Sequence, residues 1–192
     1  MRGRIGTLHD TGKNYLQRKE RERMKLQRKA LKHYLDYTFK RELKSAAWEV
    51  LGDDIENMSV ELNPDTDQKE NILGQIRTSD KGYKPSISAD PYYADPEKKI
   101  YPKIREIAMD RLRGDKCKTY MLEVIVEDTS AAKQLAYVQE VMVKPKSYGG
   151  DTEGVDFPFN ILEDGERIKG YVTSESLNTD SPVFTEGAIE AA

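Results

Sequence analysis

Residues 147–172, which read SYGGDTEGVDFPFNILEDGERIKGYV, carry the clearest strand pattern in the chain. Apolar residues alternate with polar ones over residues 155–161 and again over residues 168–172, as expected for strands with one buried face. The dipeptide Asp164-Gly165 separates the two runs, and Asp-Gly between alternating runs is a strong hairpin signal. The sequence therefore predicts two strands joined by a tight turn at this dipeptide.

The rest of the chain is polar and unevenly charged. Of its 192 residues 37% are hydrophobic and 34% charged, and the mean hydropathy is −0.77, which favours one domain with a small core and extended polar segments. Residues 1–44 hold 14 Lys and Arg against 5 acidic residues, so that 17 basic and 29 acidic residues remain for the other 148. A basic N-terminal segment is thus joined to an acidic body.

Several features exclude classes of protein. The single cysteine, Cys117, rules out an intramolecular disulfide and a multi-cysteine metal site, and we expect a buried thiol. No run approaches the ~18 apolar residues of a membrane span, and residues 1–10 lack the apolar centre of a signal peptide. We therefore expect a soluble protein that is cytosolic when made.

Residues 13–35 contain strong helix formers and no Gly or Pro, with a thin apolar stripe, which predicts a charged helix. Met24 also reads as a possible start of the chain, which would make the first 23 residues an upstream extension. Residues 59–62 and 72–78 predict a hairpin around a long polar loop, residues 63–70. Apolar residues at helical spacing predict a helix over residues 100–112, with Gly114 as its stop.

Two more strands are predicted over residues 119–128 and 135–144, and the aperiodic tail from residue 176 predicts an arm. The expected organisation is a basic helical arm over residues 1–44, a β domain over 45–175 and a C-terminal arm over 176–192.

We find no constellation of residues that supports catalysis. His9 and His33 lie in the basic segment, far in sequence from any acidic pair, so solvated surface positions are favoured. Asp65 and Asp67 resemble part of a calcium loop, but the glycine and the distal glutamate are missing. We therefore expect no enzyme, no catalytic residue, no cofactor and no metal. The basic segment, residues 1–44, leaves a nucleic-acid-binding module as the alternative class.

Two groups of segments resemble the major tail protein, or tail tube protein, of long-tailed bacteriophages, with a lean to non-contractile tails. The first group is residues 51–66 (LGDDIENMSVELNPDT), 71–74 (NILG) and 82–85 (GYKP). The second is residues 147–154 (SYGGDTEG), 157–160 (FPFN) and 164–170 (DGERIKG). The match covers about residues 30 to 175, and the segment before Met24 departs from it.

The resemblance implies a mainly β protein, a two-sheet β-sandwich with one flanking helix and a long assembly hairpin. It implies six copies in a ring, and rings stacked into a tube that conducts DNA during ejection. The implied partners are other copies of the chain, a tape measure protein, tail terminator and distal tail proteins, and DNA in transit without sequence-specific binding. The implied location is the virion tail, assembled in the host cytoplasm. A head-to-tail joining ring protein of similar fold is a further alternative.

By analogy with that family, the loop over residues 63–70 and the terminal arms would join successive rings. The predicted ring-stacking residues are Asn63, Pro64, Asp65, Thr66, Asp67, Gln68, Lys69 and Glu70. The strands around 59–62 and 72–78 would form an inner barrel, with Glu61 and Gln75 as candidates for the lumen wall.

Overall fold

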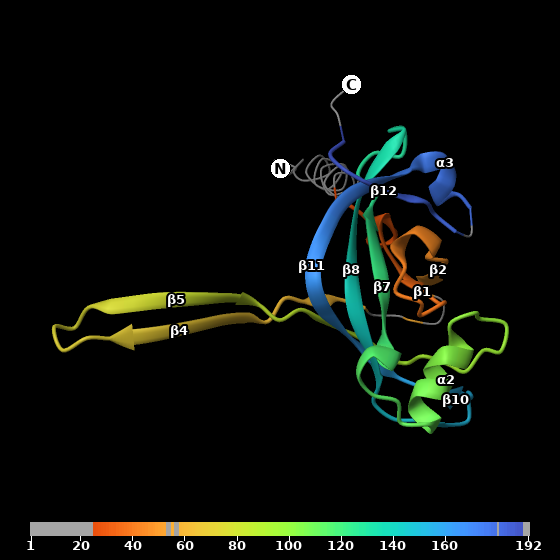
Figure 1. Cartoon of the computed structure of the whole chain (residues 1–192), viewed down its shortest axis with the longest axis horizontal. Coiled ribbons are helices and arrows are strands. Elements are labelled where there is room, and N and C mark those ends of the chain that lie inside the picture. Colours follow the sequence, from red (N-terminus) through yellow and green to blue (C-terminus); the bar gives the residue numbers. More distant parts are fainter. Residues whose placement is uncertain (1–24, 53–54, 56–57, 180, 190–192) are drawn as a thin grey trace, which may run out of the picture.

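A computed structural model describes residues 25–52, 55, 58–179 and 181–189 (Figure 1). The first half of the helix predicted over residues 13–35, the candidate start at Met24 and His9 lie outside these residues.

Eight strands form one curled antiparallel sheet in the order β2-β1-β7-β8-β11-β6-β3, and β12 pairs with β11. Their bounds are β1 (Leu31–Asp36), β2 (Trp48–Leu51), β3 (Val60–Glu61), β6 (Ser86–Ala89), β7 (Lys118–Ile125), β8 (Lys133–Pro145), β11 (Phe159–Thr173) and β12 (Phe184–Glu186). Two separate two-stranded ribbons are β4 (Pro64–Glu70) with β5 (Ile76–Tyr83), and β9 (Gly149–Gly150) with β10 (Val155–Asp156). The helices are α2 (Tyr101–Met109), the one-turn α3 (Ser174–Leu177) and the 3-10 turns η1 (Arg28–Ala30), η2 (Leu43–Ser45) and η3 (Gly114–Cys117).

The mainly β class and the flanking helix are confirmed, but the described strands of the body lie in one curled sheet and not in the two sheets of a sandwich. Strands β8 and β11 are 13 and 15 residues long and pair with each other at the centre of the sheet. Strands β7, β1 and β2 follow on the β8 side and strands β6 and β3 on the β11 side, so all of them belong to one sheet. Neighbouring residues of β1, Tyr34 and Leu35, belong to two different buried clusters. Since successive side chains of a strand point to opposite faces, the sheet is covered on both faces.

The tight turn predicted at Asp164-Gly165 is wrong, because β11 runs through it without reversing. Between the pairs Asp164↔Glu140 and Ile168↔Val138, β11 has three residues where β8 has one, so the strand bulges. Gly165 takes the left-handed conformation that such a bulge favours (φ 72°), and its carbonyl accepts a hydrogen bond from Gln139 Nε2 at 3.1 Å. The apolar alternation resumes after the bulge. In the sequence, a strand with such a bulge therefore shows the same pattern as two strands joined by a tight turn.

The helix predicted over residues 13–35 is also wrong for its described part, because residues 25–27 are not helical and Arg28–Ala30 form only a 3-10 turn. Residues Leu31–Asp36 form β1, which lies between β2 and β7 inside the sheet. Burial on both faces there outweighs the helix propensity of the segment. Residues 31–44 therefore belong to the β domain and not to an arm. The C-terminal segment also returns to the sheet, because β12 pairs with β11.

The helix predicted over residues 100–112 is confirmed for Tyr101–Met109, with Pro102 in its first turn. It ends before Gly114, because Arg111 already takes a left-handed conformation (φ 52°). Ile104 and Ile107 are buried, and Ile104 packs in the same cluster as Val143 of β8. The helix thus covers one end of the sheet (Figure 1).

Candidate assembly surfaces

Strands β4 and β5 form a long ribbon that protrudes from the body (Figure 1). We call residues 64–83 the arm. Among the described strands, β4 and β5 pair only with each other, and every residue from 68 to 81 is exposed. Because no side chain of this stretch is buried, and both outer edges carry unpaired backbone groups, the arm is the most open surface of the fold.

The end of the arm presents apolar side chains to solvent. Asn71 Oδ1 accepts hydrogen bonds from the backbone N–H groups of Leu73 and Gln75, both at 3.0 Å, and thereby fixes the turn. Ile72 is 103% exposed, Leu73 77% and Ile76 67%. Clustered exposed apolar side chains of this kind mark an interaction surface.

Charged residues at the base of the arm form ion pairs within one copy. Lys81 Nζ lies 2.5 Å from Asp67 Oδ2 and Lys84 Nζ lies 2.7 Å from Asp65 Oδ2. The hydrogen bond that Lys84 donates to the Asp65 carboxylate raises the pKa of Lys84. Asn63 Nδ2 donates to Ser86 Oγ at 3.0 Å, which ties the root of the arm to β6.

The predicted ring-stacking loop is not a loop, because residues Pro64–Glu70 are strand β4. The hairpin exists, but its turn lies at residues 71–75 and not at 63–70. Glu61 lies at the root of the arm and Gln75 at its end, with the whole seven-residue strand β4, roughly 23 Å long, between them. The two candidate lumen residues are therefore not brought together within one copy.

Strand β4 was missed because its residues show no apolar alternation. Such alternation arises only where one face of a strand is buried, and neither face of β4 is. The sequence did contain two β-branched residues, Thr66 and Thr78. They lie in the two segments that flank a turn with Asn71 and Gly74.

The glycine-rich stretch at residues 147–154 forms a small hairpin, and its strands β9 and β10 pair Val155 with Gly150. Phe157 and Phe159, which follow it, are buried as the alternation predicts. Gly150 has a φ of +149°, and a Cβ there would lie 2.0 Å from the carbonyl oxygen of Gly154. The hairpin thus requires glycine at position 150.

We expect Gly150→Ala to lower the free energy of unfolding by about 1–3 kcal/mol, because the new methyl group collides with backbone atoms. Gly149→Ala is the matched control, since a Cβ at that position meets no atom within 4 Å. Urea denaturation followed by circular dichroism measures both. Equal losses in the two variants would contradict the role assigned to Gly150.

His33 is buried, 1% exposed, contrary to the predicted surface position. Its Nε2 lies 3.1 Å from Glu123 Oε1 on the adjacent strand β7. Arg167, which the β11 bulge brings over the sheet, pairs with the other oxygen of Glu123. Burial alone would raise the pKa of Glu123, but the contacts with His33 and Arg167 outweigh it and lower that pKa. This cluster, in which His33 and Glu123 are buried and Arg167 is partly exposed, joins β1, β7 and β11.

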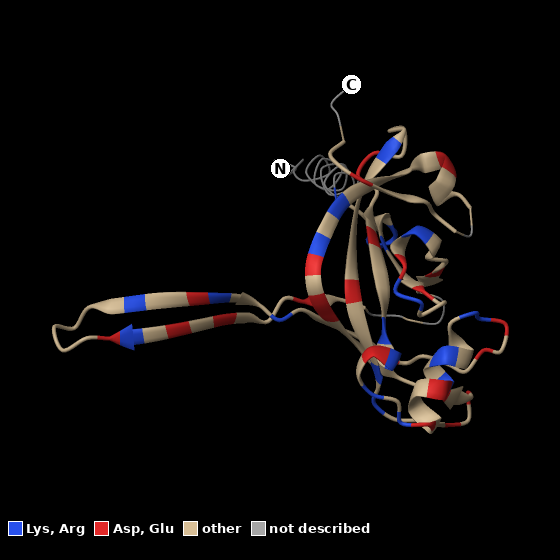
Figure 2. Ribbon diagram, viewed as in Figure 1, with Lys and Arg blue, Asp and Glu red and all other residues tan. Residues whose placement is uncertain are grey.

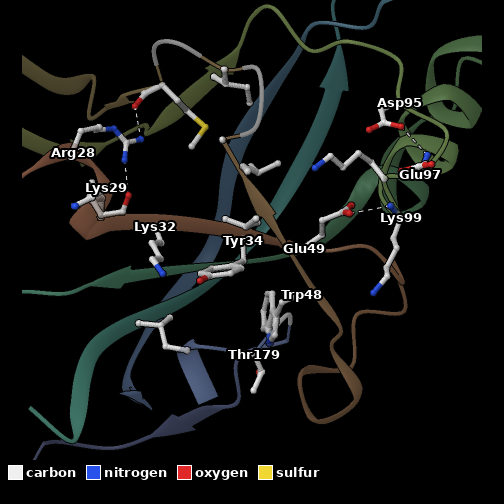
Figure 3. A pocket seen from close by; sticks show the side chains of 18 residues that line it. Arg28, Lys29, Lys32, Tyr34, Trp48, Glu49, Asp95, Glu97, Lys99 and Thr179 are labelled. Atoms are coloured by element: carbon white, nitrogen blue, oxygen red, sulfur yellow. Dashed lines mark hydrogen bonds between the residues drawn. The ribbon is translucent and has the colours of Figure 1, made fainter. Parts of the chain in front are cut away.

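A groove of about 830 Å³ lies along β2, the edge strand of the sheet (Figure 3). Tyr34 and Trp48 lie on one wall, and Glu49 accepts hydrogen bonds from the backbone N–H groups of Lys99 and Ile100 at 3.0 and 2.6 Å. Charged side chains of both signs line the groove. The basic ones are Arg28, Lys29, Lys32, Lys98 and Lys99, and the acidic ones are Glu49, Asp95 and Glu97. They form no nucleophile-and-base arrangement.

Cys117 is buried as predicted, and its thiol donates to the carbonyl oxygen of Leu112 at 3.1 Å. Within the described part of the chain, no group of three or more His, Cys, Asp or Glu side chains could hold a metal ion. The helices in that part are too short or too polar to cross a membrane.

No family model matches the chain and no curated protein is similar to it. Among solved structures, it is similar to a chain from an extracellular contractile injection system, described as "PVC sheath/tube terminator in extended state". The likeness covers 76% of this chain and 96% of that chain, with 11% identity and a TM-score of 0.45. A likeness at this level assigns neither a family nor a function.

Proposed function

We propose that the protein is a structural subunit of a phage tail or tail-like tube, and that copies join through the arm. The observation that carries this proposal is the arm itself, whose residues 68–81 are all exposed. An isolated two-stranded ribbon is marginally stable in water, and open edges with exposed apolar residues are normally covered. A neighbouring copy supplies such a cover.

The tail assignment comes from the sequence resemblance. That resemblance implies that six copies form a ring, that rings stack into a tube and that DNA passes through the tube. In this proposal the tube surrounds a tape measure protein and ends at terminator and distal tail proteins. Contacts between copies that close by rotation give rings, and contacts along the axis give a filament. The protein acts by polymerisation and not by catalysis.

The competing nucleic-acid module would use the basic residues 1–44. Of these, Leu31–Asp36 form the internal strand β1, and its residues His33, Tyr34, Leu35 and Asp36 are buried. These six residues therefore cannot act as a separate arm, but they hold only one of the 14 basic residues, Lys32, so a nucleic-acid module would have to use the others.

The test is to replace residues 65–82 by a two-residue Asn-Gly turn between Pro64 and Tyr83, which face each other in the register. We expect the wild-type protein to form rings or tubes by negative-stain electron microscopy, and the variant to remain monomeric by light scattering. Circular dichroism should show the same sheet in both, because the arm shares no core with the body.

Three outcomes separate the proposals. Assembly that persists without the arm would contradict the role proposed for it. Rings of the wild-type protein that never stack would favour a joining ring protein over a tube subunit. Salt-sensitive retention of DNA by a wild-type protein that does not assemble would favour the nucleic-acid module.

A further inference from the structure

The two faces of the arm differ in charge. Basic and acidic residues lie along both β4 and β5 (Figure 2). The register places Lys69 opposite Arg77 and Glu70 opposite Ile76, and successive side chains alternate between faces. Over residues 65–81 the basic face holds three cations and two acids, and the acidic face holds two acids and no cation. Their charged residues are Asp65, Asp67, Lys69, Arg77 and Lys81 on the basic face, and Glu70 and Asp80 on the acidic face.

The charges near the end of the arm lack partners within one copy. In the described residues, no ion pair or hydrogen bond engages the side chain of Lys69, Glu70 or Arg77, in contrast to the matched pairs at the base. Like charges directly opposite each other in a ladder are destabilising. Carboxylates from another molecule would therefore stabilise the arm by pairing with Lys69 and Arg77.

The basic face is also hollowed. A depression of about 620 Å³ lies against it. The lining residues are Asp67, Lys69, Arg77, Ser79 and Lys81 of this face, together with Glu70, Asn71 and Thr78. It gives room for side chains that approach this face from another ribbon. Stacked ribbons lie about 10 Å apart, a distance at which side chains from both interdigitate.

We infer that the partner of the basic face is the acidic face of the arm of a second copy. Both faces belong to one element and carry opposite charge. A single type of contact between copies therefore pairs the charges of both faces. Each copy offers a different face to each neighbour, so the contact is head-to-tail and can propagate. The inference rests on the proposed function and adds to it the face-to-face stacking of arms.

The test is an exchange of charge between the two faces. Lys69→Glu with Arg77→Glu makes both faces acidic. Glu70→Lys with Asp80→Asn removes the negative charge from the acidic face, and the asparagine keeps an oxygen for the hydrogen bond that Asp80 Oδ1 accepts from the Gly82 N–H at 2.9 Å. A variant with Lys40→Glu and Lys116→Glu is the control, because it changes two exposed cations outside the arm.

We expect each arm variant alone to need about tenfold more protein to assemble, measured by light scattering and electron microscopy, because charge complementarity becomes repulsion. An equimolar mixture of the two arm variants should assemble at close to the wild-type concentration. The control should assemble like the wild type. Wild-type assembly should weaken between roughly 0.05 and 0.5 M salt, since exposed charges are screened.

Arm variants that each assemble as readily as the wild type would overturn the stacking of arms and leave the proposed function intact. Variants that fail alone and also fail as a mixture would overturn it too, because the charges would then meet a different surface. A wild-type protein that stays monomeric up to its solubility limit would overturn both the inference and the proposed function.

Discussion

Phe159→Ala is expected to lower the free energy of unfolding by about 3–5 kcal/mol, as large-to-small changes in a packed core do. Phe159 is fully buried and is the largest such side chain in the described residues. Its ring meets that of Tyr92 edge to face with centroids 5.1 Å apart. It also lies where β11 pairs with both Ala89 and Pro145, so the cavity would open between three strands.

Urea denaturation followed by circular dichroism measures this loss, which is a large part of the roughly 5–15 kcal/mol by which domains are stable. Tyr83→Ala is the control, because Tyr83 is an aromatic residue of the arm that is 62% exposed. It should change the free energy of unfolding by less than about 0.5 kcal/mol. Similar losses at the two positions would show that the core is not centred where we place it.

Glu123→Gln is expected to lower the free energy of unfolding by about 1–3 kcal/mol at pH 7, since it removes the charge from the acceptor of the contacts with His33 and Arg167, and hydrogen bonds to charged groups are the stronger ones. Glu123 is 5% exposed and lies between His33 and Arg167. Because its pKa is lowered on folding, the stabilisation is present above the unfolded pKa of about 4.3 and is lost as the pH falls through the folded pKa.

The difference between wild type and Glu123→Gln should therefore be large at pH 7 and shrink towards pH 3. Chemical denaturation at both values, at constant ionic strength, measures it. Glu127→Gln is the matched control, because Glu127 lies four residues along the chain and is exposed. A difference that stays the same at pH 7 and pH 3 would mean that the ionised carboxylate does not carry the effect.

The sequence predicts best those elements that bury one face. The helix Tyr101–Met109 and the buried positions of Phe157 and Phe159 follow directly from apolar spacing. Strand β1 could not be predicted in this way, because it is covered on both faces and flanked by charged residues. Its sequence resembles a helix until its neighbours in the sheet are known.

The candidate site divides along similar lines. A hairpin in the region of residues 59–83 follows from the sequence, but its exact strands do not, since an arm that buries nothing leaves no apolar pattern. The cluster of His33, Glu123 and Arg167 joins residues more than 130 positions apart in the chain. Only the pairing of β1 with β7 and the bulge in β11 bring these side chains together.

Because the arm and the sheet share no buried side chain, the proposed joining of copies through the arm would be adjustable separately from the folding of one copy. Substitutions over residues 68–81 can alter how tightly copies associate without weakening the core, and substitutions in the core leave the outer surface of the arm unchanged. The strength of assembly can therefore vary over a wide range at constant stability of the subunit. Proteins whose interfaces are continuous with their cores do not have this freedom.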